Sequence, residues 1–179
     1  MTAFDSRRGT RGARQPTGRL MVWANAFMAR RIRKGKNPFG FNVLILTTTG
    51  RKSGVERTAP VGWFPDGNGN WLIVASANGA TDNPAWYYNL AAAPDKARIE
   101  VDGTEIPVTA QQLRGAEREA AWSIITTTAP RFGKYEAKTD RAIPVILLTR
   151  RASDLSRFRC PGRELARHTR CVTLRRPAR

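Results

Sequence analysis

Alternation of apolar and polar residues along the chain predicts a domain built mainly from short β-strands. In residues 97–101, apolar side chains at every second position are separated by charged ones, so one face of this strand is buried. An Asp102-Gly103 pair then supplies the positive φ angles of a tight turn, and the alternation resumes beyond it. The strands predicted in this way are residues 43–49, 57–64, 71–76, 97–101, 106–110 and 143–149.

Helical spacing of apolar residues predicts helices at residues 19–36, 84–90 and 115–128. The first helix ends in four basic residues, which suit a helix C-terminus, and Gly35 is its stop signal. Its apolar stripe consists of Leu20, Trp23, Ala24, Phe27 and Met28. This helix either covers one end of the core or lies on an anionic membrane surface.

Six short strands with few helices predict a mainly β protein of the α+β class, folded as a small, partly closed barrel. An alternating βαβ sheet does not fit this order of elements. The expected organisation is a flexible basic arm at 1–18, the amphipathic helix at 19–36, the barrel domain at 37–150, and an Arg-rich, disordered tail at 151–179.

The distribution of charge separates the barrel from its two ends. The 179 residues include 31 Lys and Arg and 14 Asp and Glu, a net charge of +17, but residues 37–149 are neutral as a group. The ends could therefore hold a polyanion or simply aid solubility, and we expect no specific nucleic-acid partner because the domain itself carries no basic excess. No apolar run of 18 residues and no secretory signal are present, so a cytoplasmic protein is expected.

The sequence also excludes several kinds of catalysis. His168 is the only histidine, so a Ser-His-Asp or Cys-His mechanism has no base in the domain. Cys160 and Cys171 flank that histidine in the tail, where three irregularly spaced ligands are a weak signal for a metal, and no metal site is expected. An enzyme of this composition would depend on an organic cofactor.

Three segments could carry chemistry. In residues 47–57, two glycines bracket Arg51, Lys52 and Ser53, which predicts an anion-binding turn with converging backbone N–H groups or, equally well, an ordinary solvated hairpin turn. Residues 74–90 begin with small side chains and continue into a helix N-terminus. Aromatic residues at such a spacing in that helix more often pack in the core than line a cofactor site. Residues 129–141 are expected to form a long polar loop.

Taken together, these segments closely resemble the deazaflavin-dependent nitroreductase family, which includes F420H2-dependent quinone reductases. The matching strings are L-T-T-T-G-R-K-S-G, V-A-S-A-N-G-A, N-P-A-W-Y-Y-N-L and Y-x-x-x-T-D-R-x-I-P-V. The resemblance implies a split β-barrel related to FMN-binding proteins, an actinobacterial source, and reduced coenzyme F420 as hydride donor, with FMN a less favoured cofactor. The alternative is a non-catalytic barrel that binds F420, FMN or haem.

The resemblance also implies roles for individual residues. The coenzyme's phosphate and acidic tail would lie on the cationic turn, its ring on the small-residue strand end, and one helix would close the site. In that order, the implied coenzyme-binding residues are Thr49, Gly50, Arg51, Lys52, Ser53, Arg57, Ala75, Ser76, Ala77, Gly79, Trp86 and Asn89. Tyr135 and Ser76 are the expected catalytic residues, which would orient the acceptor and stabilise developing negative charge.

The acceptor is expected to be a quinone-like, nitroaromatic or other conjugated small molecule. Where the best-known nitro-reducing member carries tyrosines, this chain has Gly62, Ala129 and Phe132, and only Tyr135 persists. These replacements predict a wider and less polar acceptor pocket that is poorly suited to nitroimidazoles. Peripheral attachment to the inner face of the cell membrane is a separate expectation that depends on the N-terminal helix.

Overall fold

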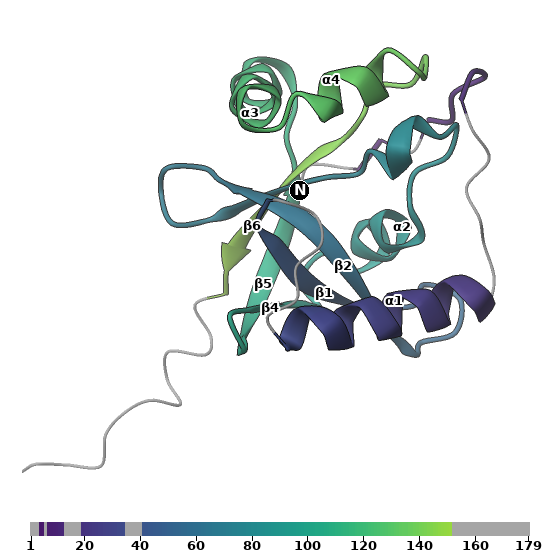
Figure 1. The fold of residues 1–179 in the computed structure, drawn as a ribbon, viewed down its shortest axis with the longest axis vertical. Helices are drawn as coiled ribbons and strands as arrows, with labels where there is room; N and C mark the ends of the chain where they lie inside the picture. The colour runs from purple at the N-terminus through teal and green to yellow at the C-terminus, as the bar shows by residue number, and fades with distance from the viewer. Residues whose placement is uncertain (1–3, 6, 13–18, 35–40, 152–179) are drawn as a thin grey trace, which may run out of the picture.

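The computed structural model describes residues 4–5, 7–12, 19–34 and 41–151. Six antiparallel strands close into a barrel in the order β1-β2-β3-β6-β5-β4, which confirms the mainly β prediction (Figure 1). The strands are β1 (Val43–Thr49), β2 (Glu56–Pro65), β3 (Trp71–Val74), β4 (Ala97–Val101), β5 (Thr104–Gln112) and β6 (Val145–Arg150).

The alternation in the sequence decides which side chains fill the barrel. In β4, Ala97 and Ile99 are buried while Arg98 between them is partly exposed, as the pattern predicts. One buried cluster fills the barrel and includes Leu44, Leu46 and Ile146, while a second cluster lies between the barrel and the helices that follow β5. Pro107 falls in the part of β5 that pairs with β4 alone, where its missing N–H breaks no ladder bond to β6.

The helices are α1 (Arg19–Arg33), α2 (Ala85–Ala92), α3 (Gly115–Thr128) and α4 (Arg131–Glu136), with a short 3₁₀ helix, η1, at Ala77–Gly79. The first three helices match their predicted positions. The expectation of a loop at 129–141 was wrong for its central part, because α4 occupies residues 131–136. The sequence did not predict this helix because of Pro130 and Gly133. Phe132 and Tyr135 do lie together, with ring centroids 5.6 Å apart.

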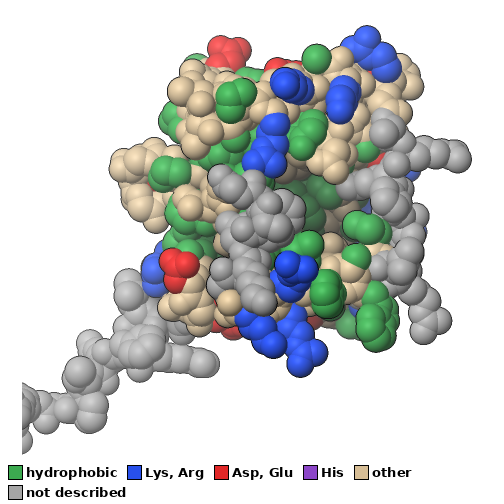
Figure 2. All heavy atoms as spheres, in the orientation of Figure 1, with side chains coloured by type: hydrophobic (Ala, Val, Ile, Leu, Met, Phe, Trp, Pro, Cys, Tyr) green, Lys and Arg blue, Asp and Glu red, His purple; other side chains and the backbone are tan. Residues whose placement is uncertain are grey.

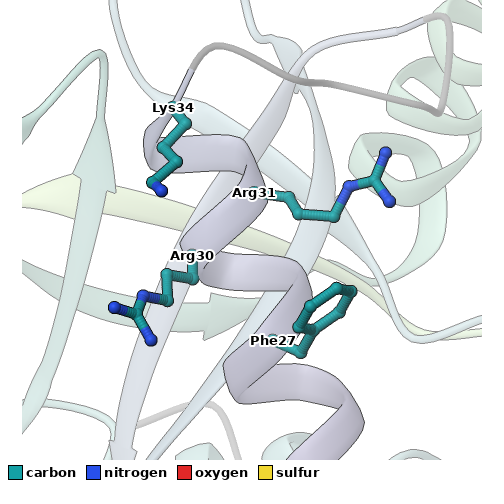
Figure 3. Close-up of a pocket in the computed structure, with 4 residues that line it drawn as sticks. All are labelled: Phe27, Arg30, Arg31 and Lys34. Atoms are coloured by element: carbon teal, nitrogen blue, oxygen red, sulfur yellow. The ribbon is translucent and has the colours of Figure 1, made fainter.

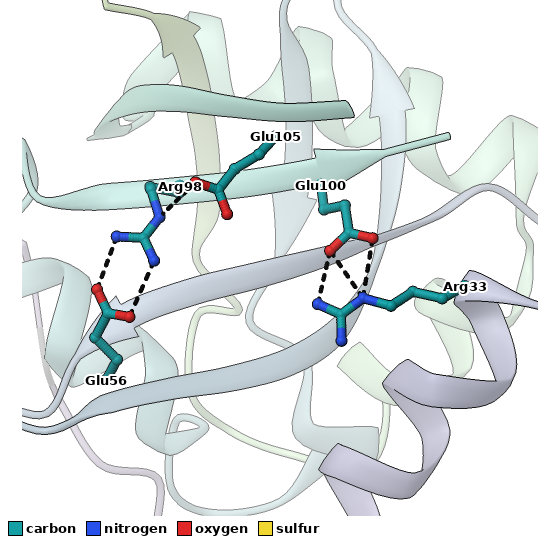
Figure 4. A network of polar contacts seen from close by, with 5 residues as sticks. All are labelled: Arg33, Glu56, Arg98, Glu100 and Glu105. Atoms are coloured by element: carbon teal, nitrogen blue, oxygen red, sulfur yellow. Dashed lines mark hydrogen bonds and ion pairs between the residues drawn. The ribbon is translucent and has the colours of Figure 1, made fainter. Parts of the chain in front are cut away.

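Helix α1 lies across the barrel, with Trp23 and Phe27 of its predicted stripe exposed. Ala29 is buried at the contact with the barrel, whereas Trp23 is 78% exposed and Phe27 61% exposed. The end of the helix is fixed by Arg33, whose guanidinium donates to both carboxylate oxygens of Glu100 on β4, with 2.7 Å for the closest pair (Figure 4). This hydrogen-bonded ion pair raises the pKa of Arg33 and joins α1 to the barrel wall.

A second ion-pair group on the same wall joins three strands. Arg98 donates to both carboxylate oxygens of Glu56, at 2.7 and 2.9 Å, and contacts Glu105 at 3.0 Å (Figure 4). The hydrogen bonds from Arg98 lower the pKa of the Glu56 carboxyl group. Glu56 begins β2, Arg98 lies in β4 and Glu105 in β5, so this group connects β2 to β4 across the intervening strand β1.

The N-terminal residues 4–5 and 7–12, here called the strap, pack against the barrel loops. Asp5 donates its backbone N–H to Gln112, and Thr10 bonds Asp140. These residues belong to the arm predicted over 1–18, and they find hydrogen-bond acceptors on the domain. The remainder of the arm and the tail, including Cys160, His168 and Cys171, lie outside the described residues.

Two further observations concern the described part of the chain only. It contains no group of three or more His, Cys, Asp or Glu side chains arranged to hold a metal ion. None of its helices is both long enough and apolar enough to span a bilayer.

Candidate functional site

Two of the three predicted segments follow strands that run in the same direction. β2 is antiparallel to both β1 and β3, so β1 and β3 run in one direction, with Val74 at the end of β3 level with Gly62 of β2 and hence with Val43 at the start of β1. The turn at 50–55 follows β1, and the segment 75–80 follows β3. In addition, β2 pairs with β3 only from Trp63 onward, which leaves its first half without a partner on that side.

The cationic turn at 50–55 is tightly closed. Gly50 donates its N–H to Val55 at 2.9 Å, and Gly54 donates to Gly50 at 2.8 Å with a φ of +66°. Ser53 also donates to Gly50, so these backbone N–H groups serve the turn itself rather than a converging anion nest. An anion at this turn would therefore meet the side chains of Lys52 and Arg57, which are exposed and have no ion-pair partner among the described residues.

The side chain of Asn89 in α2 binds the backbone of the cationic turn. Its side-chain oxygen accepts the Arg51 backbone N–H at 3.1 Å, and its side-chain nitrogen donates to the Thr48 hydroxyl at 3.0 Å. Asn89 is only 8% exposed, and these two bonds occupy both ends of its amide. The Arg51 guanidinium lies 5.0 Å from the centre of the Tyr88 ring, a second contact between the turn and α2.

The segment after β3 adopts an unusual backbone conformation. Ala77, Asn78 and Gly79 have φ angles of +47°, +57° and +80°, so three successive residues are left-handed. This conformation is strained for alanine and persists only where the surroundings impose it. The Ser76 and Ala77 backbone N–H groups donate to no other residue that the structure describes, and both belong to the predicted ring-binding segment.

Arg141 holds this left-handed turn from inside the protein. It is 5% exposed, and its guanidinium donates to the carbonyl oxygens of Ala75 (3.0 Å), Ser76 (2.7 Å) and Ala80 (2.7 Å). A fourth bond of 2.6 Å goes to the side-chain oxygen of Asn83. Burial lowers the pKa of Arg141 from its usual value, yet a guanidinium remains protonated in proteins and keeps all its donors.

The two supports belong to one short segment of sequence. Asn83 precedes α2 and binds Arg141, whereas Asn89 lies within α2 and binds the cationic turn. Both asparagine side chains are buried. Residues 83–89 therefore connect the left-handed turn to the cationic turn and set their relative position.

Helix α4 brings the third predicted segment to the left-handed turn. A β-carbon added to Gly79 would lie 2.8 Å from the Tyr135 carbonyl oxygen and 2.9 Å from the Lys138 β-carbon. Only glycine fits there, so this close approach places Tyr135 beside the turn. Within the described residues, the Tyr135 hydroxyl has no hydrogen-bond partner, and its ring packs against the second core cluster.

The predicted widening of the acceptor pocket does not occur at Gly62. A β-carbon at Gly62 would lie within 3.1 Å of three atoms of the Phe41 ring, so Phe41 fills the place that a larger residue would need. Phe41 also lies against Phe64 and Phe132, with centroid distances of 6.3 Å. Ala129 and Phe132 are buried in the second core cluster, which makes this region apolar, as expected, but filled rather than wide.

The structure thus links the two turns, which hold most of the predicted residues, through residues 83–89. Trp86 and Tyr88 pack against the main core, as their spacing favoured, and Tyr87 is fully buried. Three residues to which the sequence assigned no role support the site, namely Arg141, Asn83 and Phe41. Arg141 had a signal in the T-D-R string, but a lone arginine in a polar stretch is typical of a surface position.

Basic side chains gather around this part of the molecule. On the face shown in Figure 2, Lys and Arg side chains lie above and below a recessed area of hydrophobic side chains. Helix α1 contributes a separate hollow of about 430 Å³, lined by Phe27, Arg30, Arg31 and Lys34. Figure 3 shows Phe27 and Arg31 on one side of the helix and Arg30 and Lys34 on the other.

Comparison with known proteins gives consistent matches over the barrel. The family model described as F420H(2)-dependent quinone reductase matches residues 19–150. The F420H(2)-dependent quinone reductase Rv1261c of Mycobacterium tuberculosis is 40% identical over 111 residues, which cover 60% of this chain and 73% of that protein.

Two solved structures are also similar. An F420-H2 dependent reductase is 36% identical with a TM-score of 0.55, and the match covers 60% of this chain and 94% of that one. A chain described as a domain-swapped dimer is 30% identical with a TM-score of 0.56, over 73% of this chain and 96% of that one.

Proposed function

The chain belongs to the F420H(2)-dependent quinone reductase family, and we propose that the cationic and left-handed turns together form its coenzyme site. Membership makes the protein an oxidoreductase whose coenzyme is reduced F420. One observation carries the placement of the site: the left-handed turn at 77–79 is held by Arg141 and is linked to the cationic turn through residues 83–89.

The cationic turn suits the negatively charged part of the coenzyme. Lys52 and Arg57 are exposed and have no acidic partner among the residues described, so they can neutralise phosphate or carboxylate groups. Arg51 is oriented by its contact with the Tyr88 ring and is also exposed. Since the turn's own backbone bonds are satisfied, its shape is fixed before a ligand binds.

The left-handed turn suits the edge of a flat ring. Ala77 has a small, partly exposed side chain, so a planar group can approach the backbone there, while Ala75 and Gly79 are buried behind it. The Ser76 and Ala77 N–H groups, which lack partners in the described structure, can donate to polar atoms at the ring's edge. Arg141 occupies the carbonyl groups on the opposite side and keeps these donors in place.

When bound, reduced F420 supplies a hydride for an electron-poor acceptor. The chain's own contribution is to hold donor and acceptor in reacting geometry and to stabilise the charge that develops on the acceptor. Tyr135 is proposed to donate its hydroxyl hydrogen bond to the acceptor, and Ser76 to assist from the strand end. Phe41 and Phe132 exclude water from the adjoining apolar region.

The acceptor class follows from the same residues. Quinones are the acceptors that the family name states, and the apolar packing around Gly62 favours a flat, weakly polar molecule. We include nitroaromatic and other conjugated acceptors in the proposal as slower substrates. A single hydroxyl, that of Tyr135, can serve such an acceptor in place of the several tyrosines of the nitro-reducing relative.

Steady-state turnover tests the proposed function. Purified protein is mixed with reduced F420 and menadione, and the return of the oxidised coenzyme's visible absorbance is followed, with a nitroimidazole as the second acceptor. Turnover with menadione, and slower turnover with the nitroimidazole, is the expected result. Binding of F420 with no turnover of either acceptor would favour the non-catalytic alternative instead.

The exposed face of α1 supports a further proposal, that the protein binds anionic membrane surfaces, where hydrophobic quinones dissolve. Trp23 and Phe27 are the two most exposed large hydrophobic side chains of the described residues. Arg30, Arg31 and Lys34 line a hollow together with Phe27, so apolar insertion and attraction to headgroups would act together.

Vesicle flotation tests this attachment. Vesicles that contain anionic lipid should retain the protein at low salt, and the double variant Trp23→Ala/Phe27→Ala should be retained less. Ile124→Ala, which removes an exposed apolar residue from α3, is the matched control and should behave like the wild type. Equal flotation of all three proteins, or flotation on purely neutral vesicles, would contradict the proposal.

A further inference from the structure

The strap begins with contacts to the barrel core. The Phe4 ring meets the Tyr87 ring edge-on, with centroids 5.5 Å apart. The Asp5 N–H donates to the side-chain oxygen of Gln112 at 3.0 Å, and the single O–H of Tyr87 lies within hydrogen-bond distance of both the Asp5 carbonyl and that same Gln112 oxygen. The first strap residues are thus fixed against α2 and β5.

The strap continues to Asp140, which binds three donors. The Thr10 backbone N–H lies 2.8 and 3.0 Å from the two carboxylate oxygens, and its hydroxyl donates at 2.5 Å. The Arg11 backbone N–H adds a bond of 3.0 Å. These hydrogen bonds hold the pKa of Asp140 well below its usual range, so the carboxylate stays charged.

The strap also packs directly on the left-handed turn and the residues after it. Gly9 donates its N–H to the Thr81 carbonyl at 2.9 Å, and Arg8 pairs with Asp82. A β-carbon at Gly12 would lie 2.6 Å from the Gly79 carbonyl oxygen and 2.9 Å from the Thr81 nitrogen. The strap therefore covers the turn so closely that no side chain fits between them.

Two residues adjacent in sequence, Asp140 and Arg141, bind the strap and the left-handed turn, respectively. Arg141 is buried and holds the carbonyl groups of the turn from within, whereas Asp140 is exposed and holds the strap outside it. The strap lies upstream of the region that the family model matches, residues 19–150. Its contacts therefore involve residues outside the matched region.

We propose that the strap, anchored by Asp140, holds the left-handed turn at 77–79 in the conformation that the coenzyme ring requires. Asp140 is then a positioning residue, which acts on the coenzyme through the strap and the turn. When the strap detaches, the strained turn spends a smaller fraction of its time in the binding conformation. The apparent affinity for the coenzyme falls in proportion to that fraction. This inference rests on the proposed coenzyme site.

Two variants of the full chain test it, with one control. Asp140→Ala removes the anchor, and Gly12→Ala places a β-carbon against the Gly79 carbonyl oxygen. Asp95→Ala is the control because Asp95 is an exposed aspartate whose side chain has no described partner. Two quantities are measured: the dissociation constant for F420, and hydrogen exchange of the Gly79 and Ala80 amides without any ligand.

Both strap variants should raise the dissociation constant roughly five- to fiftyfold and accelerate exchange at Gly79 and Ala80, and the control should do neither. The double variant should resemble the single variants because both changes act through the same strap. At saturating coenzyme, kcat should stay within about twofold of the wild type, since bound coenzyme restores the turn.

The outcomes separate this inference from the proposed function. A wild-type chain that does not bind F420 overturns the proposed function, and the exchange data then still decide whether the strap holds the turn. A wild-type chain that binds F420, with strap variants that bind equally well, overturns this inference alone. Unchanged amide exchange in both strap variants also overturns it.

Discussion

The side-chain oxygen of Asn83 accepts a 2.6 Å hydrogen bond from the buried guanidinium of Arg141. Arg141 gives its other bonds to three carbonyl groups of residues 75–80, so the two side chains together fix the left-handed turn to the start of α2. Since α2 also supports the cationic turn through Asn89, a single buried network positions both halves of the proposed coenzyme site.

Replacement of Arg141 should affect both stability and coenzyme binding. Arg141→Ala leaves buried carbonyl groups without donors, and each such group costs about 1–3 kcal/mol, so a loss of at least about 3 kcal/mol in the free energy of unfolding is expected. Arg141→Lys should fall between the alanine variant and the wild type because one ammonium group cannot reach all four acceptors. Urea unfolding measures the loss, and stability within about 1 kcal/mol of wild type for Arg141→Ala would contradict this role.

Removal of the Asn89 side chain should displace the cationic turn. Asn89→Ala deletes the acceptor of the Arg51 N–H and the partner of the Thr48 hydroxyl, so F420 affinity should fall by about 1–2 kcal/mol. Fluorescence titration gives the dissociation constant. Asn68→Ala, in the exposed β2–β3 loop, is the control, and an equal loss in both variants would argue against a specific support by Asn89.

Charge removal on the cationic turn should weaken coenzyme binding directly. Lys52→Ala combined with Arg57→Ala should cost roughly 1–3 kcal/mol for each charged hydrogen bond that the coenzyme no longer receives. The wild type should bind F420 less tightly as salt increases, and the double variant should show a flatter salt dependence. Isothermal titration at several salt concentrations tests this, with the exposed residue variant Lys96→Ala as the control. Unchanged affinity in the double variant would show that the anionic tail of the coenzyme binds elsewhere.

Burial of the Tyr87 phenol should make the folded protein lose stability at alkaline pH. This burial raises the pKa of Tyr87 to about 12 from an ordinary value of 10.0, because the charged form is poorly solvated in the core. A raised pKa stabilises the folded state fully below pH 10.0, and this contribution disappears as the pH rises toward about 12. Tyr87→Phe should therefore unfold with a shallower pH dependence in this window, and parallel curves for both proteins would count against it.

The strands were predictable because burial on one face leaves a period of two in the sequence, as in Ala97 and Ile99. The side of α1 that contacts the barrel was not predictable from the sequence. A stripe such as Trp23 and Phe27 has the same spacing whether it packs against a core or binds a partner. Arg141 and the strap were missed for a shared reason. Their roles depend on hydrogen-bond acceptors brought close by the fold, and no spacing between residues records those acceptors.

A side-by-side equilibrium titration of the full chain with oxidised F420 and with FMN tests the central claim most directly. The cationic turn and the small-residue, left-handed turn should together give saturable binding of F420, with FMN bound more weakly because it lacks the acidic tail that Lys52 and Arg57 are proposed to hold. Tighter binding of FMN, or no binding of F420, would contradict the account.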